Sequence, residues 1–135
     1  MKYKFLEHTA DVKFQAFGKD VKEVFENSFL ALKETICGKK KIKGKEKIKI
    51  TAKGKDYESL LYGFLEEILY LIDAEEFVAT KIKEMKIRRF RLTAILMGDK
   101  IKNYRFTNSV KAITYNEMFI KKEKGRWISQ VVLDV

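Results

Sequence analysis

The segment that most constrains the fold is YESLLYGFLEEILYLIDA, residues 57–74. Asp56 precedes it and is a favourable N-terminal cap, so the sequence predicts a helix that begins there. The apolar residues recur at helical spacing and form a broad face: Leu60, Leu61, Phe64, Leu65, Ile68, Leu69, Leu71 and Ile72. Such a helix is either buried at the centre of a domain or also touches a partner. Gly63, in its interior, suggests close packing against a sheet.

A second helix is predicted between Asp20, a capping residue with Glu23 three positions later, and Gly38, a C-terminal stop. Strand-like patterns cover residues 2–6, 11–17, 46–53, 77–86, 87–97, 100–106, 110–120 and 127–135. Gly98-Asp99 and Gly125 mark expected turns. Because strands and helices do not alternate strictly, we expect one α+β domain over residues 1–135. Its sheet is mixed or mainly antiparallel and is packed with two main helices.

The charge balance is strongly basic, with 29 Lys and Arg against 19 Asp and Glu and a net charge of +10. This favours contact with RNA or with a protein that handles RNA, but a lysine-rich, proline-free chain also fits a heat-adapted protein. The alternating lysines of residues 46–53 suggest either a polyanion patch or, preferably, a solvated edge that resists aggregation. With no apolar leader, no membrane span and one cysteine, we expect a cytoplasmic protein that does not contact membrane.

Residues for familiar catalysis are scarce. The chain has neither of the glycine-rich nucleotide-binding motifs, and it holds one histidine, His8, and one cysteine, Cys37. Cys37 is expected at the end of a helix, where the helix dipole does not activate a thiolate, and a buried structural role fits it better. A serine triad or a zinc site would need more ligands and bases than these. We therefore do not expect an ordinary hydrolase.

Two aspartates lack a structural explanation. Asp11 and Asp134 lie in or beside predicted strands, where aspartate is disfavoured, whereas the other aspartates are explained as caps, a turn or a helix end. The carboxylate of Val135 adds a third anionic group beside Asp134. If the three meet, they repel unless a cation joins them or one takes up a proton, and oxygen ligands suit Ca²⁺ or Mg²⁺. The alternative is a solvated chain end and a turn aspartate.

The histidine of the same stretch, EHTADV, has two interpretations. His8 can hydrogen-bond a group near the turn and, with Thr9, hold the loop in shape. As a proton shuttle it would need an acid partner near a substrate. Glu7 is adjacent in sequence, but neighbours along a strand do not face each other.

Four separated motifs, in order, give the whole chain a resemblance to the archease family. They are FLEHTADV, DYESLLYGFLEEILYL, VKAITYNEM and the terminal WISQVVLDV. The resemblance implies an SHS2-like strand–helix–strand–strand core. It also implies a metal site made of Asp11, Asp134 and Val135, and a lysine, Lys111, that contacts the partner or its nucleotide. His8 is a further expected partner contact. Asn116 stands where many relatives have histidine, so an acid–base role at that position is in doubt.

The function that the resemblance implies is that of a protein cofactor rather than an enzyme. Relatives of this kind assist the RtcB-type RNA ligase of tRNA splicing, promoting guanylylation of the ligase and many turnovers. We expect this chain to do so through an acidic tip that holds a divalent cation, Ca²⁺ or Mg²⁺. The alternative implied by the resemblance is a chaperone-like modulator, or an RNA-binding partner, of a tRNA-modifying methyltransferase. A third possibility, a hidden metal-dependent enzyme, predicts turnover by the isolated chain.

Overall fold

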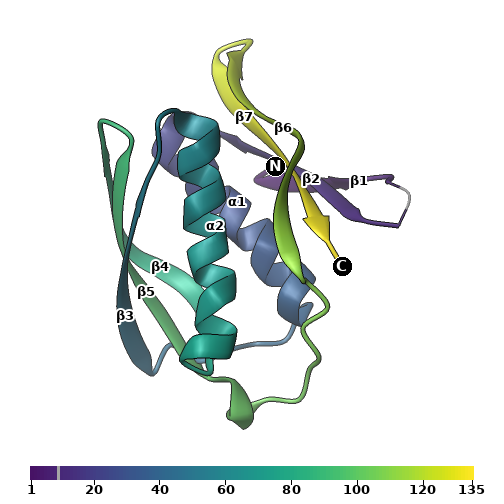
Figure 1. Cartoon of the computed structure of the whole chain (residues 1–135), viewed down its shortest axis with the longest axis vertical. Helices are drawn as coiled ribbons and strands as arrows, with labels where there is room; N and C mark the ends of the chain where they lie inside the picture. The colour runs from purple at the N-terminus through teal and green to yellow at the C-terminus, as the bar shows by residue number, and fades with distance from the viewer. Residues whose placement is uncertain (9) are drawn as a thin grey trace.

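Two antiparallel sheets and two helices make up the computed structural model, which describes residues 1–8 and 10–135 (Figure 1). One sheet has the strand order β1-β2-β7-β6 and the other β3-β5-β4. The elements are β1 (Tyr3–Leu6), β2 (Val12–Gly18), α1 (Val21–Cys37), β3 (Glu46–Lys53), α2 (Tyr57–Ala74), β4 (Phe77–Arg88), β5 (Arg91–Lys100), the 3₁₀ turn η1 (Ile101–Asn103), β6 (Ala112–Glu123) and β7 (Arg126–Asp134). The predicted α+β class with two main helices is confirmed, and every strand pair given by the register is antiparallel.

The caps proposed from the sequence define both helices. Asp20 Oδ1 accepts the Glu23 amide at 2.8 Å at the start of α1, and Gly38 closes its end with φ +63°. Asp56 Oδ1 accepts the Ser59 amide at 2.8 Å at the start of α2. Each such cap satisfies a backbone donor that the first helical turn leaves unpaired. Both helices therefore begin where the capping residues predict.

The broad apolar face of α2 is explained by its position. Both helices contact strands of both sheets, so α2 has apolar neighbours on more than one side (Figure 1). Phe64 of α2 stacks on Phe25 of α1 with ring centroids 6.0 Å apart. A Cβ added to Gly63 would lie 3.8 Å from the Ala52 Cβ, an ordinary contact distance. This position of α2 therefore packs against β3. Burial at the centre, rather than a partner, accounts for this face.

The predicted turn at Gly98-Asp99 is wrong. Both residues lie inside β5, where Gly98 pairs with Ala79 and Asp99 with Val78. The chain reverses instead at Arg89 and Phe90, whose φ angles are +50° and +60°. A two-residue hairpin of this hand usually carries Asn or Gly, so the sequence offered no turn signal there.

The predicted strand at residues 100–106 is also wrong, because Asp99 organises a turn. Its buried carboxylate accepts hydrogen bonds from the Tyr104 hydroxyl at 2.7 Å, the Lys100 amide at 2.8 Å and the Asn103 side chain at 3.2 Å. These bonds lower the pKa of Asp99, and the bond from the Tyr104 hydroxyl has the largest effect. They close η1, after which the chain is irregular up to residue 111. In the part of the chain that the structure describes, no helix is long and apolar enough to cross a membrane.

Candidate functional site

The register of β2 and β7 brings the two unexplained aspartates to one end of a sheet. Val12 at the start of β2 pairs with Leu133 near the end of β7. Continuing this antiparallel register by one residue places Asp11 opposite Asp134, with side chains on the same face of the sheet. Both residues are partly exposed. The register therefore brings residues separated by nearly the whole length of the chain to one end of the sheet, on its two middle strands.

The chain end completes a group that we call the acidic tip: the side chains of Asp11 and Asp134 with the terminal carboxylate of Val135. The Val135 side chain packs against the core, as Leu133 does, and so diverges from the side chain of Asp134. On the other side of β7, the Lys111 amide donates to the Asp134 carbonyl oxygen at 2.7 Å. This bond fixes the last residues of β7 between β2 and the start of β6.

The turn that carries Asp11 is tied to a distant strand by what we call the His8 clamp, formed by His8, Lys13 and Glu117. His8 Nε2 lies 2.9 Å from Glu117 Oε2, and Lys13 Nζ lies 3.1 Å from Glu117 Oε1. Because a carboxylate only accepts, His8 carries its proton on Nε2. Hydrogen bonding by His8, and then by Lys13, lowers the pKa of Glu117. The carboxylate that contacts His8 is thus Glu117 and not Glu7, while the proton-shuttle interpretation, which also needs a substrate, stays a prediction.

Glu117 reaches the clamp because β6 is interrupted. Thr114 pairs with Val132, and the next paired residue is Phe119, which faces Gln130. The residues between them bulge out of the ladder, and Glu117 has φ +56°. The Gln130 side chain donates to the Glu117 carbonyl oxygen at 2.8 Å and so supports the bulge from β7. Nothing in the sequence around KAITYNEM marks this bulge, so sequence reasoning missed both Glu117 and Lys13.

The second nitrogen of His8 faces the acidic tip. Nδ1 lies 3.9 Å from Asp11 Oδ2, beyond hydrogen-bond distance, and within residues 1–8 and 10–135 it is a buried atom without a partner. The predicted role of His8 in shaping this turn therefore has a structural basis in its bond to Glu117. The prediction for Thr9 lies outside the described residues.

The remaining predicted residues are placed as follows. Lys111 is exposed and lies beside Asp134 at the edge of the acidic tip. Cys37 ends α1 and is buried, and this burial raises the pKa of its thiol. A thiol in this state is a poor nucleophile, in keeping with the structural role expected for it. Asn116 is exposed on the β6 bulge.

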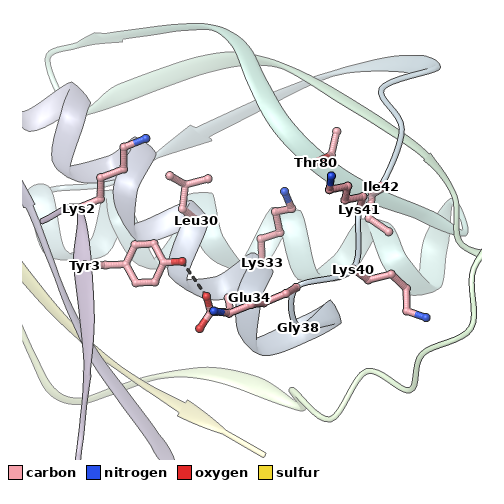
Figure 2. A pocket seen from close by; sticks show the side chains of 11 residues that line it. Lys2, Tyr3, Leu30, Lys33, Glu34, Gly38, Lys40, Lys41, Ile42 and Thr80 are labelled. Atoms are coloured by element: carbon pink, nitrogen blue, oxygen red, sulfur yellow. Dashed lines mark hydrogen bonds between the residues drawn. The ribbon is translucent and has the colours of Figure 1, made fainter.

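A separate cavity of about 580 Å³ lies at the C-terminal end of α1 (Figure 2). Its wall includes Tyr3, whose hydroxyl donates to Glu34 at 3.0 Å, and several lysines: Lys2, Lys33, Lys39, Lys40 and Lys41. Lysine side chains are expected beside a helix C-terminus, because the helix dipole favours positive charge there. The acidic tip and this cavity are different parts of the surface.

The donor set of the acidic tip suits a hard cation. Its atoms are carboxylate oxygens, the ligands that Ca²⁺ and Mg²⁺ prefer. Among the described residues, no group of three or more His, Cys, Asp and Glu side chains is arranged to hold a metal ion. The acidic tip supplies two such side chains and a main-chain carboxylate, so any cation there would keep water in its remaining positions.

Fold and site together define a small α+β protein with a carboxylate-bearing tip. The Archease protein family model (MTH1598/TM1083) matches residues 3–135. The protein archease of Methanosarcina barkeri is 42% identical, with 98% of this chain and 95% of the relative covered. That of Pyrococcus furiosus is 41% identical, with 96% and 95% covered. The chain belongs to the archease family, which supports a protein-cofactor role in RNA processing.

Solved structures share the fold. The solution structure of Methanobacterium thermoautotrophicum protein 1598 superposes with a TM-score of 0.83 at 34% identity, covering 98% of both chains. The crystal structure of an archease, described as a possible chaperone, from Thermotoga maritima gives a TM-score of 0.71 at 17% identity. The match covers 98% of this chain and 96% of that one. At that identity the second match concerns the fold alone.

Proposed function

We propose that this protein activates an RtcB-type tRNA-splicing RNA ligase, promoting its guanylylation and multiple turnover, and that the acidic tip is the acting surface. Membership of the archease family supports the class of partner. The observation that supports the choice of surface is the β2–β7 register, which pairs Val12 with Leu133 and, continued by one residue, would set Asp11 opposite Asp134 beside the chain end. Three carboxylates brought together there would repel one another, a cost that a bound cation offsets.

In this proposal Asp11, Asp134 and the Val135 carboxylate hold a divalent cation, Ca²⁺ or Mg²⁺. When bound, the cation supplies positive charge near the phosphates of the ligase nucleotide. The protein's own residues set the geometry. The His8 clamp orients the turn that carries Asp11, and the Lys111 amide holds the main chain of Asp134. The exposed side chains of the site, Lys111 above all, are left to contact the partner.

The test is a multiple-turnover ligation assay with the cognate ligase. The unaltered protein is expected to convert about one turnover into many, while it joins no RNA alone. Asp11→Asn and Asp134→Asn are expected to abolish the stimulation. Asp73→Asn is the matched control, because Asp73 is an exposed carboxylate at the end of α2 and its loss changes the net charge equally. Full stimulation by both tip variants would refute the acidic-tip mechanism.

Direct cation binding is measured separately by calorimetric titration with Ca²⁺ and with Mg²⁺. A few residues added after Val135 convert the terminal carboxylate into a peptide bond and are expected to weaken both binding and stimulation. The same residues added before Met1 are expected to leave both intact, since Met1 is 88% exposed and outside the tip. Equal behaviour of the two extended proteins would show that the terminal carboxylate is not a ligand.

A chaperone-like action, which the resemblance to the archease family implies, is the second candidate; the Thermotoga maritima archease is itself described as a possible chaperone. The client would be a tRNA-modifying methyltransferase. This reading predicts that the protein suppresses aggregation of the methyltransferase or changes the tRNA position it modifies, with Asp11→Asn as effective as the unaltered protein. Stimulation of the ligase that depends on Asp11 would instead favour the acidic tip.

A further inference from the structure

The outward face of the β3-β5-β4 sheet is a surface distinct from the acidic tip. The helices pack on its inner face, against residues such as Ile50 and Leu92. In Figure 1 this sheet and the C-terminus lie on opposite sides of the two helices. The outward residues alternate with the buried ones along each strand, so the register states which side chains share the open face.

Cationic side chains line both edges of this face. The edge strand β3 contributes Lys47, Lys49 and Lys53, all exposed. The opposite edge strand, β4, contributes Lys86 and Arg88, and the middle strand β5 adds Arg91. Lys83 lies at a shift in the β4–β5 register and joins this face because its side chain approaches Lys47. We call this set the basic face. Lys53, Arg91 and Arg88 stand in one row across the three strands, because Lys53 pairs with Arg91 and Arg91 with Arg88.

The basic face has little compensating negative charge. Among the outward residues that the register assigns to it, the carboxylate is Glu84, which pairs with Lys86 at 3.4 Å. Like charges on opposed strands destabilise a sheet. Lys47 and Lys83 approach closely enough that Lys83 lowers the pKa of Lys47.

The apolar side chains of the middle strand do not turn this face into a membrane-binding surface. Ile95 and Met97 point outward between the rows of cations and are partly buried. A shallow hollow of about 150 Å³ at the centre is lined by Lys49, Glu84 and Lys86 with Thr93 and Ile95. A membrane-binding surface needs protruding apolar anchors beside its cations, and these half-covered side chains do not supply them.

The spacing of the rows fits a chain of phosphates. Outward side chains on one strand recur about every 6.8 Å, and neighbouring strands lie about 4.8 Å apart. Lysine makes point-charge contacts to phosphate without reading base edges. We propose that the basic face binds the phosphate backbone of single-stranded RNA without preference for base sequence. The choice of RNA over other polyanions follows from the family's role in RNA processing; the charge array itself is independent of how the acidic tip acts.

The sequence interpretation of residues 46–53 alone favoured a solvated edge that resists aggregation. Edge protection explains the lysines of β3 and also those of β4, the other edge strand of this sheet. It does not explain Arg91 on the middle strand, which completes a row of cations with Lys53 and Arg88 across the sheet. The tertiary structure adds these rows, which no single strand reveals.

The experiment measures binding of a short labelled single-stranded RNA to the isolated protein by fluorescence anisotropy at several salt concentrations. The face variant carries Lys49→Gln, Lys83→Gln and Lys86→Gln. The matched control carries Lys39→Gln, Lys40→Gln and Lys41→Gln, which remove the same charge from exposed positions near the cavity of Figure 2. The logarithm of the affinity should fall with the logarithm of salt, and the face variant should lower that slope by about 2, at about 0.7 per phosphate contact.

At about 50 mM salt the face variant is expected to bind at least about tenfold more weakly, and the control within about twofold of the unaltered protein. Lysine acetylation read by mass spectrometry is the second measurement. Bound RNA should protect Lys49, Lys83 and Lys86 from acetylation and leave Lys39–Lys41 reactive. This measurement uses the unaltered protein and does not depend on the folding of a variant. The proposal would be overturned if both variants lost RNA affinity equally, or if the unaltered protein bound no RNA at low salt. It would also be overturned if the basic face bound phosphatidylserine vesicles while the protein bound no RNA.

Discussion

Gly98→Ala is predicted to destabilise the protein through a clash inside the β4–β5 ladder. A Cβ on Gly98 would meet the Val78 carbonyl oxygen and would lie 2.6 Å from the ring of Phe77, which is fully buried. Neither the backbone nor that ring can move freely, so the overpacking costs about 3 kcal/mol. Replacing glycine by alanine in a strand recovers up to about 1 kcal/mol, because the unfolded chain loses freedom. The net loss is about 2 kcal/mol.

For a chain of 135 residues the entropy of unfolding is about 0.28 kcal/mol/K, so this loss lowers Tm by about 7 °C. Thermal unfolding followed by circular dichroism measures it. Gly63→Ala is the control, since its Cβ meets only ordinary contacts at 3.8 Å and a helix interior gains about 1 kcal/mol from alanine. A Tm for Gly98→Ala equal to or above that of the unaltered protein would contradict the packing role of Gly98.

Three further outcomes are expected. The pKa of Glu117 is lowered by His8, so its carboxylate stabilises the fold above the unfolded pKa of about 4.3 and loses that effect as pH falls through the folded value. The urea midpoints of Glu117→Gln and the unaltered protein should therefore differ at pH 7 and converge below about pH 4; a constant gap would argue against the clamp. Ser28 and Ser129 share a buried hydrogen bond of 2.8 Å, so Ser28→Ala should cost about 1–3 kcal/mol by leaving Ser129 unpaired. The double alanine variant should cost clearly less than the sum of the two single variants, and strict additivity would show that the bond contributes nothing. Burial raises the pKa of Cys37, so Ellman's reagent at pH 8 should react slowly with the folded protein and fully after denaturation; rapid reaction with the folded protein would show an exposed thiol.

Local sequence signals predicted the helix ends correctly, because the capping residues themselves satisfy the backbone hydrogen bonds there. Asp20, Asp56 and Gly38 end the helices because their own side chains or φ angles satisfy local bonds. The period of apolar residues predicted β3 to the residue, Glu46–Lys53. Turn prediction failed where glycine served another purpose. Gly98 gives room to a neighbouring strand, and the real turn uses Arg89 and Phe90, which carry no turn signature.

The residues of the candidate site also fall into those that the sequence could single out and those that it could not. Asp11 and Asp134 could be singled out because aspartate is disfavoured in strands and no local role explained them. Lys13 and Glu117 could not, since each is an ordinary charged residue in its own segment. They join His8 only because β6 bulges and β7 lies between the two segments.

The sequence by itself determined the class of fold and both helices with their caps, and it singled out the two aspartates that no local role explains, because these depend on periodicity, capping and local preference. Only the tertiary structure decided that the strands form two sheets, that α2 is covered on more than one side, and that Glu117 is the partner of His8. It also decided that the lysines of β3 and β4 share one face. The physical reason is strand register: whether two side chains meet depends on how distant strands pair, and no local stretch of sequence contains that pairing.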